Sequence, residues 1–207
     1  MVSNVGLILG VAGADPAPSI VRLAGLAGLI AGAVSMAAGE YVSMKAQAEL
    51  FERELELERR ELHRKPHVET VELTQIYASK GIAPDMARAL AEEMMSDPDR
   101  ALEAHAREEL GINPDELGSP VGAAVSSFGS FAGGALVPLL PWLFFSGAGA
   151  TVATVVLGVL AAASIGLLLA AFTGRSKLFS AGRQLLIATI AAGVTFGIGA
   201  VVGVGVG

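Results

Sequence analysis

The chain has 207 residues, of which 53% are hydrophobic and only 16% are charged, and 26 are glycine. This balance is unusual for a soluble domain and typical of a bundle of membrane helices. The formal net charge of −6 argues against a nucleic-acid partner, which would require a basic patch. Because the sequence has no cysteine, disulfides, thiolate metal sites and thiol nucleophiles are excluded.

The first apolar run extends from Val2 to Ala14. It has only about a dozen residues, whereas a spanning helix needs ~20. We therefore expect it to be the second half of a membrane helix whose beginning is missing, ended by the prolines at 16 and 18. The next apolar run, residues 20–43, is predicted to span the membrane, and its glycines allow a neighbouring helix to approach closely.

Nearly all Asp, Glu, Lys and Arg residues fall between Lys45 and Glu116. From Lys45 the membrane helix is predicted to continue, apparently without a break, as an acidic helix that ends at Pro66. Prolines and glycines bound three further short helices, at residues 68–80, 84–96 and 98–110. We therefore predict a polar helical domain at residues 45–118, with membrane helices at residues 1–44 and 119–207.

Three more apolar stretches follow, at residues 121–145, 151–172 and 185–206. Pro138 and Pro141 are expected to kink or break the first of them. Residues 173–177 and Arg183 are expected to form a basic loop. The predicted fold class is thus all-α: a polytopic membrane helix bundle with five spans, the first incomplete. The positive-inside tendency places the insert and the basic loop in the cytoplasm.

Two residues near the end of the second apolar run are candidates for a transport pathway. Met36 and Glu40 are four residues apart and share a helix face. A carboxylate at membrane depth is costly and indicates a pathway or a relay. The alternative is that Glu40 lies at the interface, pairs with Lys45 and only marks the helix end.

The acidic helix carries Glu54, Glu58 and Glu61 along one stripe, and Glu69 and Glu72 share a face of the next helix. Converging carboxylates repel one another unless a cation neutralises them, and hard oxygen ligands suit divalent ions. The spacing alone favours a solvated helix with Glu–Arg pairs, because arginines are interleaved. His105 and Glu109, again four apart, offer one nitrogen and one oxygen ligand.

Four segments resemble the vacuolar iron transporter family. They are SMAAGEYVS (Ser35 to Ser43), AREELGI (Ala106 to Ile112), SFGSFAGGALVPLLP (Ser127 to Pro141) and GRQLL (Gly182 to Leu186). The resemblance implies five membrane helices, a cytoplasmic metal-binding platform and a homodimer. It also implies export of Fe(II), and in some members Mn(II), from the cytosol in exchange for protons, with no tightly bound cofactor.

The resemblance also implies site residues. Met36 corresponds to the family's membrane methionine ligand, and Glu58, Glu61, Glu69, Glu72 and Glu109 fall where its platform glutamates lie. Two departures stand out. The family's Asn-Asp-Gly motif lies just before the point where this chain begins, and His105 and Ala106 replace two adjacent methionines of plant-type members.

The resulting hypothesis is a divalent-metal transporter, not an enzyme, in which platform glutamates collect the ion and Met36 and Glu40 belong to the transit site. A membrane-anchored metal buffer or sensor without flux is the alternative. A ferroxidase-like enzyme, the third possibility, predicts oxygen consumption with Fe(II).

Overall fold

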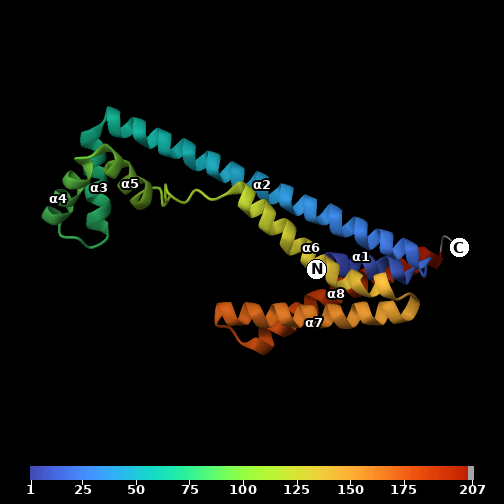
Figure 1. Cartoon of the computed structure of the whole chain (residues 1–207). Coiled ribbons are helices and arrows are strands. Elements are labelled where there is room, and N and C mark those ends of the chain that lie inside the picture. The colour runs from blue at the N-terminus through green and yellow to red at the C-terminus, as the bar shows by residue number, and fades with distance from the viewer. Residues whose placement is uncertain (205–207) are drawn as a thin grey trace. The chain divides into compact units, whose positions relative to one another are not determined.

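The computed structural model describes residues 1–204, and within that range the chain forms eight helices and no strand (Figure 1). This confirms the predicted all-α class. The helices are α1 (Val2–Gly13), α2 (Pro18–Arg64), α3 (Pro66–Ser79), α4 (Pro84–Met95), α5 (Pro98–Glu108), α6 (Pro120–Phe144), α7 (Gly147–Thr173) and α8 (Lys177–Val204).

Four of these helices, α2, α6, α7 and α8, are long and apolar enough to cross a membrane. Their outer faces carry many exposed leucines, valines and phenylalanines, as expected of surfaces that contact lipid. The chain is therefore an integral membrane protein. At 12 residues α1 is shorter than a span, so the count of five spans stays a prediction.

The described chain divides into two compact units. The membrane unit comprises residues 1–39 and the part of the chain from Ala124 onward, and the helical insert comprises Glu40–Ala123. The topological assignment of residues 1–44, 45–118 and 119–207, with the insert in the cytoplasm, stays a prediction. As expected, the acidic segment continues the apolar one within a single helix, since α2 has 47 residues.

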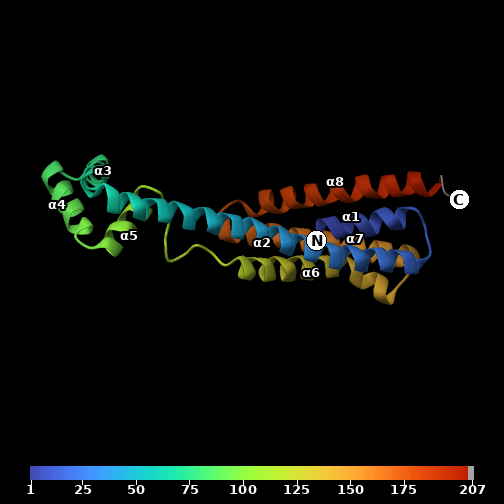
Figure 2. The ribbon, with the colours of Figure 1, turned by 90° about the horizontal axis from the view of Figure 1, so that it is seen from above.

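In the membrane unit, α8 packs along both α1 and α7 (Figure 2). Small residues permit the close approach: a Cβ built on Gly199 would collide with the carbonyl of Gly10. A compact core joins α1, α2, α6 and α7, and consists of Ile8, Val21, Leu139, Trp142 and Ala150.

In the helical insert, α3, α4 and α5 pack against one another (Figure 1). Their shared core consists of Leu73, Tyr77, Ala87, Ala91 and Ala104. The start of α5 is fixed by Asp97, whose carboxylate accepts hydrogen bonds from the backbone N–H groups of Asp99 and Arg100. This cap and the alanine-rich inner face of α5 determine where His105 points.

The predicted start of the last helix is wrong. The last helix begins at Lys177, not near residue 185, so Arg183 lies inside α8 and not in a loop. The reason is Ser176, whose hydroxyl accepts the N–H of Phe179 at 3.5 Å and caps the helix early. Of the two effects expected of Pro138 and Pro141, a break does not occur, because α6 continues through both residues. The predicted end at Val206 lies outside the described residues.

Close packing of α7 on α8 predicts different responses at two helical glycines. A Cβ on Gly166 would lie 2.6 Å from the Cα of Ala181, whereas a Cβ on Gly182 meets nothing within 4 Å. We expect Gly166→Ala to destabilise the protein by about 1–3 kcal/mol through overpacking. Gly182→Ala should be neutral or stabilising by up to ~1 kcal/mol. Thermal unfolding in detergent measures both, and equal melting temperatures would contradict the packing.

Candidate metal site

Glu58 on α2 is a carboxylate buried inside the helical insert. Glu58 is only 4% exposed, and its Oε1 has no hydrogen-bond partner among the described residues. Burial raises the pKa of the Glu58 carboxyl to about 7; the Glu109 carboxylate adds to the increase and the His105 ring opposes it. The insert therefore holds a carboxyl group that is part-protonated near neutral pH.

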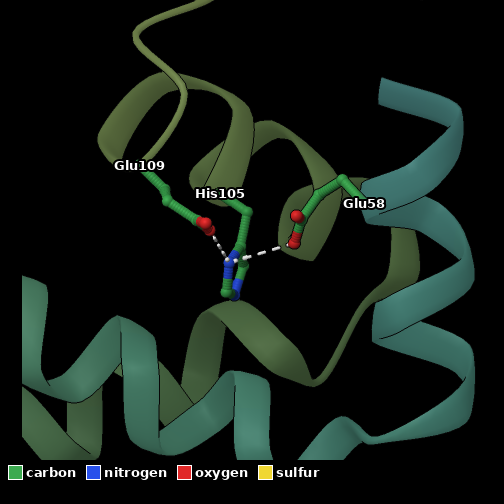
Figure 3. A group of neighbouring side chains, drawn as sticks. All are labelled: Glu58, His105 and Glu109. Carbon is green, nitrogen blue, oxygen red and sulfur yellow. Dashed lines mark hydrogen bonds and ion pairs between the residues drawn. The ribbon is translucent and has the colours of Figure 1, made fainter. Parts of the chain in front are cut away.

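His105 on α5 lies between two carboxylates that come from different parts of the chain. Its Nδ1 is 3.2 Å from Glu58 Oε1 and 3.2 Å from Glu109 Oε2 (Figure 3). Only the contact with Glu109 has hydrogen-bond geometry. The ring is fully buried, and Nε2 has no partner among residues 1–204. Thus one imidazole and one carboxylate each leave a buried polar atom unsatisfied.

Glu69 on α3 adds a third buried acid to the same region. It is 5% exposed, and burial raises the pKa of its carboxyl, with the Glu72 carboxylate as the next cause. His105 opposes this increase, while Glu61 and Glu109 contribute further repulsion. Glu72 is half-buried and Glu61 is exposed. The charges of both residues contribute to the raised pKa of the Glu69 carboxyl.

Two arginines of α2, Arg59 and Arg60, pair with Glu56. Glu56 accepts hydrogen bonds at 3.0 Å from both Arg59 and Arg60, and these bonds lower the pKa of its carboxyl. In the described part of the chain, no Arg or Lys forms an ion pair with Glu58 or Glu69. The alternative of a solvated helix with Glu–Arg pairs thus applies to Glu56 and not to the buried acids.

The geometry of Glu58, His105 and Glu109 fits a divalent cation. One ligand atom from each of the three lies within 4.8 Å of the others. Neighbouring ligands at ~2.1 Å from one ion are about 3 Å apart, which is close to the two observed 3.2 Å separations. A cation would also offset the repulsion between the Glu58 and Glu109 carboxylates. Glu109 is exposed and gives the site an opening to solvent.

The two candidates near the membrane stand apart from this cluster. Met36 lies in the membrane unit, is 51% exposed in the isolated chain, and lines a pocket with residues of α1 and α6. Glu40 is exposed and is the first residue of the helical insert. Lys45 pairs with Glu49 at 3.4 Å. The roles of Met36 and Glu40 stay predictions, as do the metal-binding roles of the six residues in the insert.

One polar residue was missed in the sequence. Asn4 lies within the apolar α1, is buried, and its Oδ1 has no hydrogen-bond partner among residues 1–204. The available signal was an amide side chain in an otherwise apolar run, since polar groups at membrane depth are costly.

Comparison with known proteins decides the family. Residues 1–200 match the VIT family. The chain belongs to this family. Among curated VIT relatives, vacuolar iron transporter 2 of Oryza sativa subsp. japonica is 33% identical over 192 residues, covering 92% of this chain and 78% of the relative. The vacuolar iron transporter of Acanthamoeba castellanii is 36% identical over 185 residues, covering 86% and 68%.

A third VIT relative, vacuolar iron transporter 1 of Eucalyptus grandis, is 33% identical over 192 residues, covering 92% of this chain and 77% of its own length. The resemblance read from the four sequence segments is thereby confirmed for the whole chain. The named relatives are transporters, in agreement with the transport function expected from the sequence.

Replacing Glu58 should stabilise the metal-free protein at high pH. The pKa of Glu58 is raised from 4.5 to about 7, so the folded state holds a proton that the unfolded state releases between these values. Stability therefore falls as pH rises from about 4.5 to 7, by an amount on the order of 3 kcal/mol. Glu58→Gln should remove this loss, as measured by thermal unfolding in detergent with chelator at pH 5 and pH 8.

Glu56→Gln provides the matched control on the same helix. The pKa of Glu56 is lowered by its arginine partners, so this carboxylate stabilises the fold at high pH and loses that effect as the pH falls. Its replacement should slightly destabilise the protein at pH 8, opposite in sign to Glu58→Gln. The same sign for both variants would show that the burial of Glu58 is not the cause.

Proposed function

We propose that this protein transports a divalent metal ion, Fe(II) or Mn(II), out of the cytosol in exchange for protons. The observation that carries the proposal is the cluster of Glu58, His105 and Glu109. Glu58 Oε1 and His105 Nε2 have no hydrogen-bond partner among the described residues, and no Lys or Arg there pairs with Glu58. Membership of the VIT family and the transporter names of the relatives support the same function.

The ligand types favour particular ions. Two carboxylate oxygens and one imidazole nitrogen suit divalent ions of borderline or hard character, such as Fe(II) and Mn(II). Without cysteine, the chain offers no thiolate for softer ions. In this proposal Glu61, Glu69 and Glu72 attract the ion to the site through their charge, and Glu109 at the exposed edge receives it first.

Proton exchange follows from the chemistry of Glu58. Its pKa of about 7 means that a proton and a metal ion compete for the same carboxylate at cytosolic pH. Metal binding displaces the proton, and protonation favours release. In the proposed cycle the helical insert faces the cytoplasm, two copies form a dimer, and the ion passes a membrane site that includes Met36 and Glu40.

Metal binding should release protons below about pH 7. Because the Glu58 carboxyl is largely protonated there, the apparent affinity should fall by about tenfold per pH unit below 7 and level off above it. Isothermal titration calorimetry of the full chain in detergent, in buffers of different ionisation enthalpy, measures both affinity and proton release. Glu58→Gln should lower the affinity at pH 8 by about tenfold or more, while Glu56→Gln should leave it unchanged.

A proton gradient should drive metal flux. Proteoliposomes with an acidic interior, containing the full chain, should accumulate Fe(II) or Mn(II) faster than liposomes without a gradient. Uptake of equal rate with and without the gradient would rule out exchange. Full metal binding together with zero flux would instead favour a membrane-anchored buffer or sensor.

A further inference from the structure

The membrane unit contains a buried amide side chain, Asn4, whose nitrogen is hydrogen bonded and whose oxygen is not. Asn4 on α1 is 1% exposed. Its Nδ2 donates to the carbonyl of Ala135 on α6 at 2.7 Å and to that of Gly25 on α2 at 3.4 Å. Because both neighbours are acceptors, the amide nitrogen must face them, and this fixes the direction of the oxygen.

The Oδ1 atom of Asn4 therefore points away from the two carbonyls, and no donor among the described residues meets it. An unpaired buried acceptor is unfavourable by about 1–3 kcal/mol. An apolar side chain of similar size would avoid this penalty. A cation that reached this oxygen would satisfy it.

The surroundings of Asn4 form a pocket that also contains Met36. The pocket of about 290 Å³ lies between α1, α2 and α6 and is lined by Ser3, Asn4, Leu7, Gly28, Gly32, Ser35, Met36 and Phe131. A Cβ on Gly28 would lie 2.7 Å from Asn4 Oδ1, so the missing side chain leaves the oxygen at the wall of this pocket. Asn4, two serines and Met36 thus line one space within the membrane unit.

We infer that Asn4 supplies an oxygen ligand to the divalent ion as it passes Met36, and thereby helps to set which metal is carried. This inference rests on the transport function proposed above. A neutral amide oxygen can bind a partly dehydrated cation without the cost of a buried negative charge. Together with the thioether of Met36 it forms a mixed hard and soft ligand set. The oxygen supports Mn(II) most, since manganese depends more on oxygen ligands than iron does.

The competing explanation is that Asn4 only fastens α1 to its neighbours. Thr154 on α7 is the matched case: it is fully buried in the same unit and its hydroxyl donates to the carbonyl of Pro138 on α6 at 3.0 Å. It does not line the pocket of Met36. If Asn4 only holds the helices together, its replacement should affect stability and leave the metal flux ratio unchanged, as expected for Thr154.

The test compares Asn4→Leu with Thr154→Val in proteoliposomes, with Fe(II) and Mn(II) supplied separately. Asn4→Leu should lower the Mn(II) to Fe(II) flux ratio by about tenfold, the factor expected from ~1.4 kcal/mol of lost ligand interaction. Thr154→Val should leave the ratio unchanged, whatever its effect on melting temperature. Metal binding by the helical insert, measured by calorimetry, should be the same in both variants and in the unaltered chain.

A second variant keeps the inference testable should Asn4→Leu fail to fold. Gly28→Ala adds a methyl group against Asn4 Oδ1 and the Leu7 side chain, so these side chains must shift, but it leaves the Asn4 amide itself chemically unaltered. It should shift the flux ratio in the same direction. An unchanged ratio in Gly28→Ala, or equal losses for both metals in Asn4→Leu as in Thr154→Val, would overturn the inference but not the transport function. Absence of flux from the unaltered chain would overturn both.

Discussion

The structure of the helical insert depends on one electrostatic constraint: Glu58 is taken out of water without receiving a cationic partner. Burial of an ionised carboxylate is too costly to persist, so either a proton or a metal ion must compensate it. His105 does not resolve the conflict, because its Nδ1 hydrogen bonds to Glu109 and only approaches Glu58. A proton and a metal ion therefore compete for the Glu58 carboxylate, and this competition makes metal binding depend on pH.

In the membrane unit, one buried polar group is the neutral amide of Asn4, which is less costly to remove from water than a carboxylate. A carboxylate at the position of Asn4 would repel the carbonyls of Ala135 and Gly25, which its amide nitrogen now binds. The amide nitrogen of Asn4 donates to these carbonyls, and the amide oxygen has no hydrogen-bond partner among the described residues. A buried cation ligand in lipid is therefore obtained at the cost of one missing hydrogen bond, which is far less than the cost of an unpaired charge.

Sequence reasoning located most helices because prolines and glycines mark their ends. Pro66, Pro84 and Pro98 each stand at the start of a helix, and Gly174, with φ of +65°, follows the end of α7. The start of α8 was missed because Ser176 acts as its cap within a stretch that reads as a basic loop. Such a cap is visible only once the backbone N–H that it accepts is known.

The sequence identified which residues belong to the candidate site, but not which of them are buried and which are exposed. Spacing placed Glu58 and Glu61 on one stripe, yet the first is buried and the second is exposed. The difference arises from the packing of α3 and α5, which a helical period cannot reveal. The pairing of Glu56 with arginines was likewise one of two possibilities that the charge pattern allowed. Asn4 escaped notice because nothing in its neighbourhood along the chain indicates that two carbonyls hold its amide.

The properties of the cluster favour transfer of an ion over its storage. A storage site gains affinity from carboxylates that are ionised before the metal arrives, since no proton then has to leave. Here burial and the neighbouring Glu109 carboxylate raise the pKa of Glu58 to about 7, so each binding event near neutral pH works against a bound proton. The same competition weakens the hold on the metal whenever a proton returns. A site on the entry route of a transporter must release its ion as readily as it captures it, and a carboxyl group that is part-protonated at the working pH meets both demands.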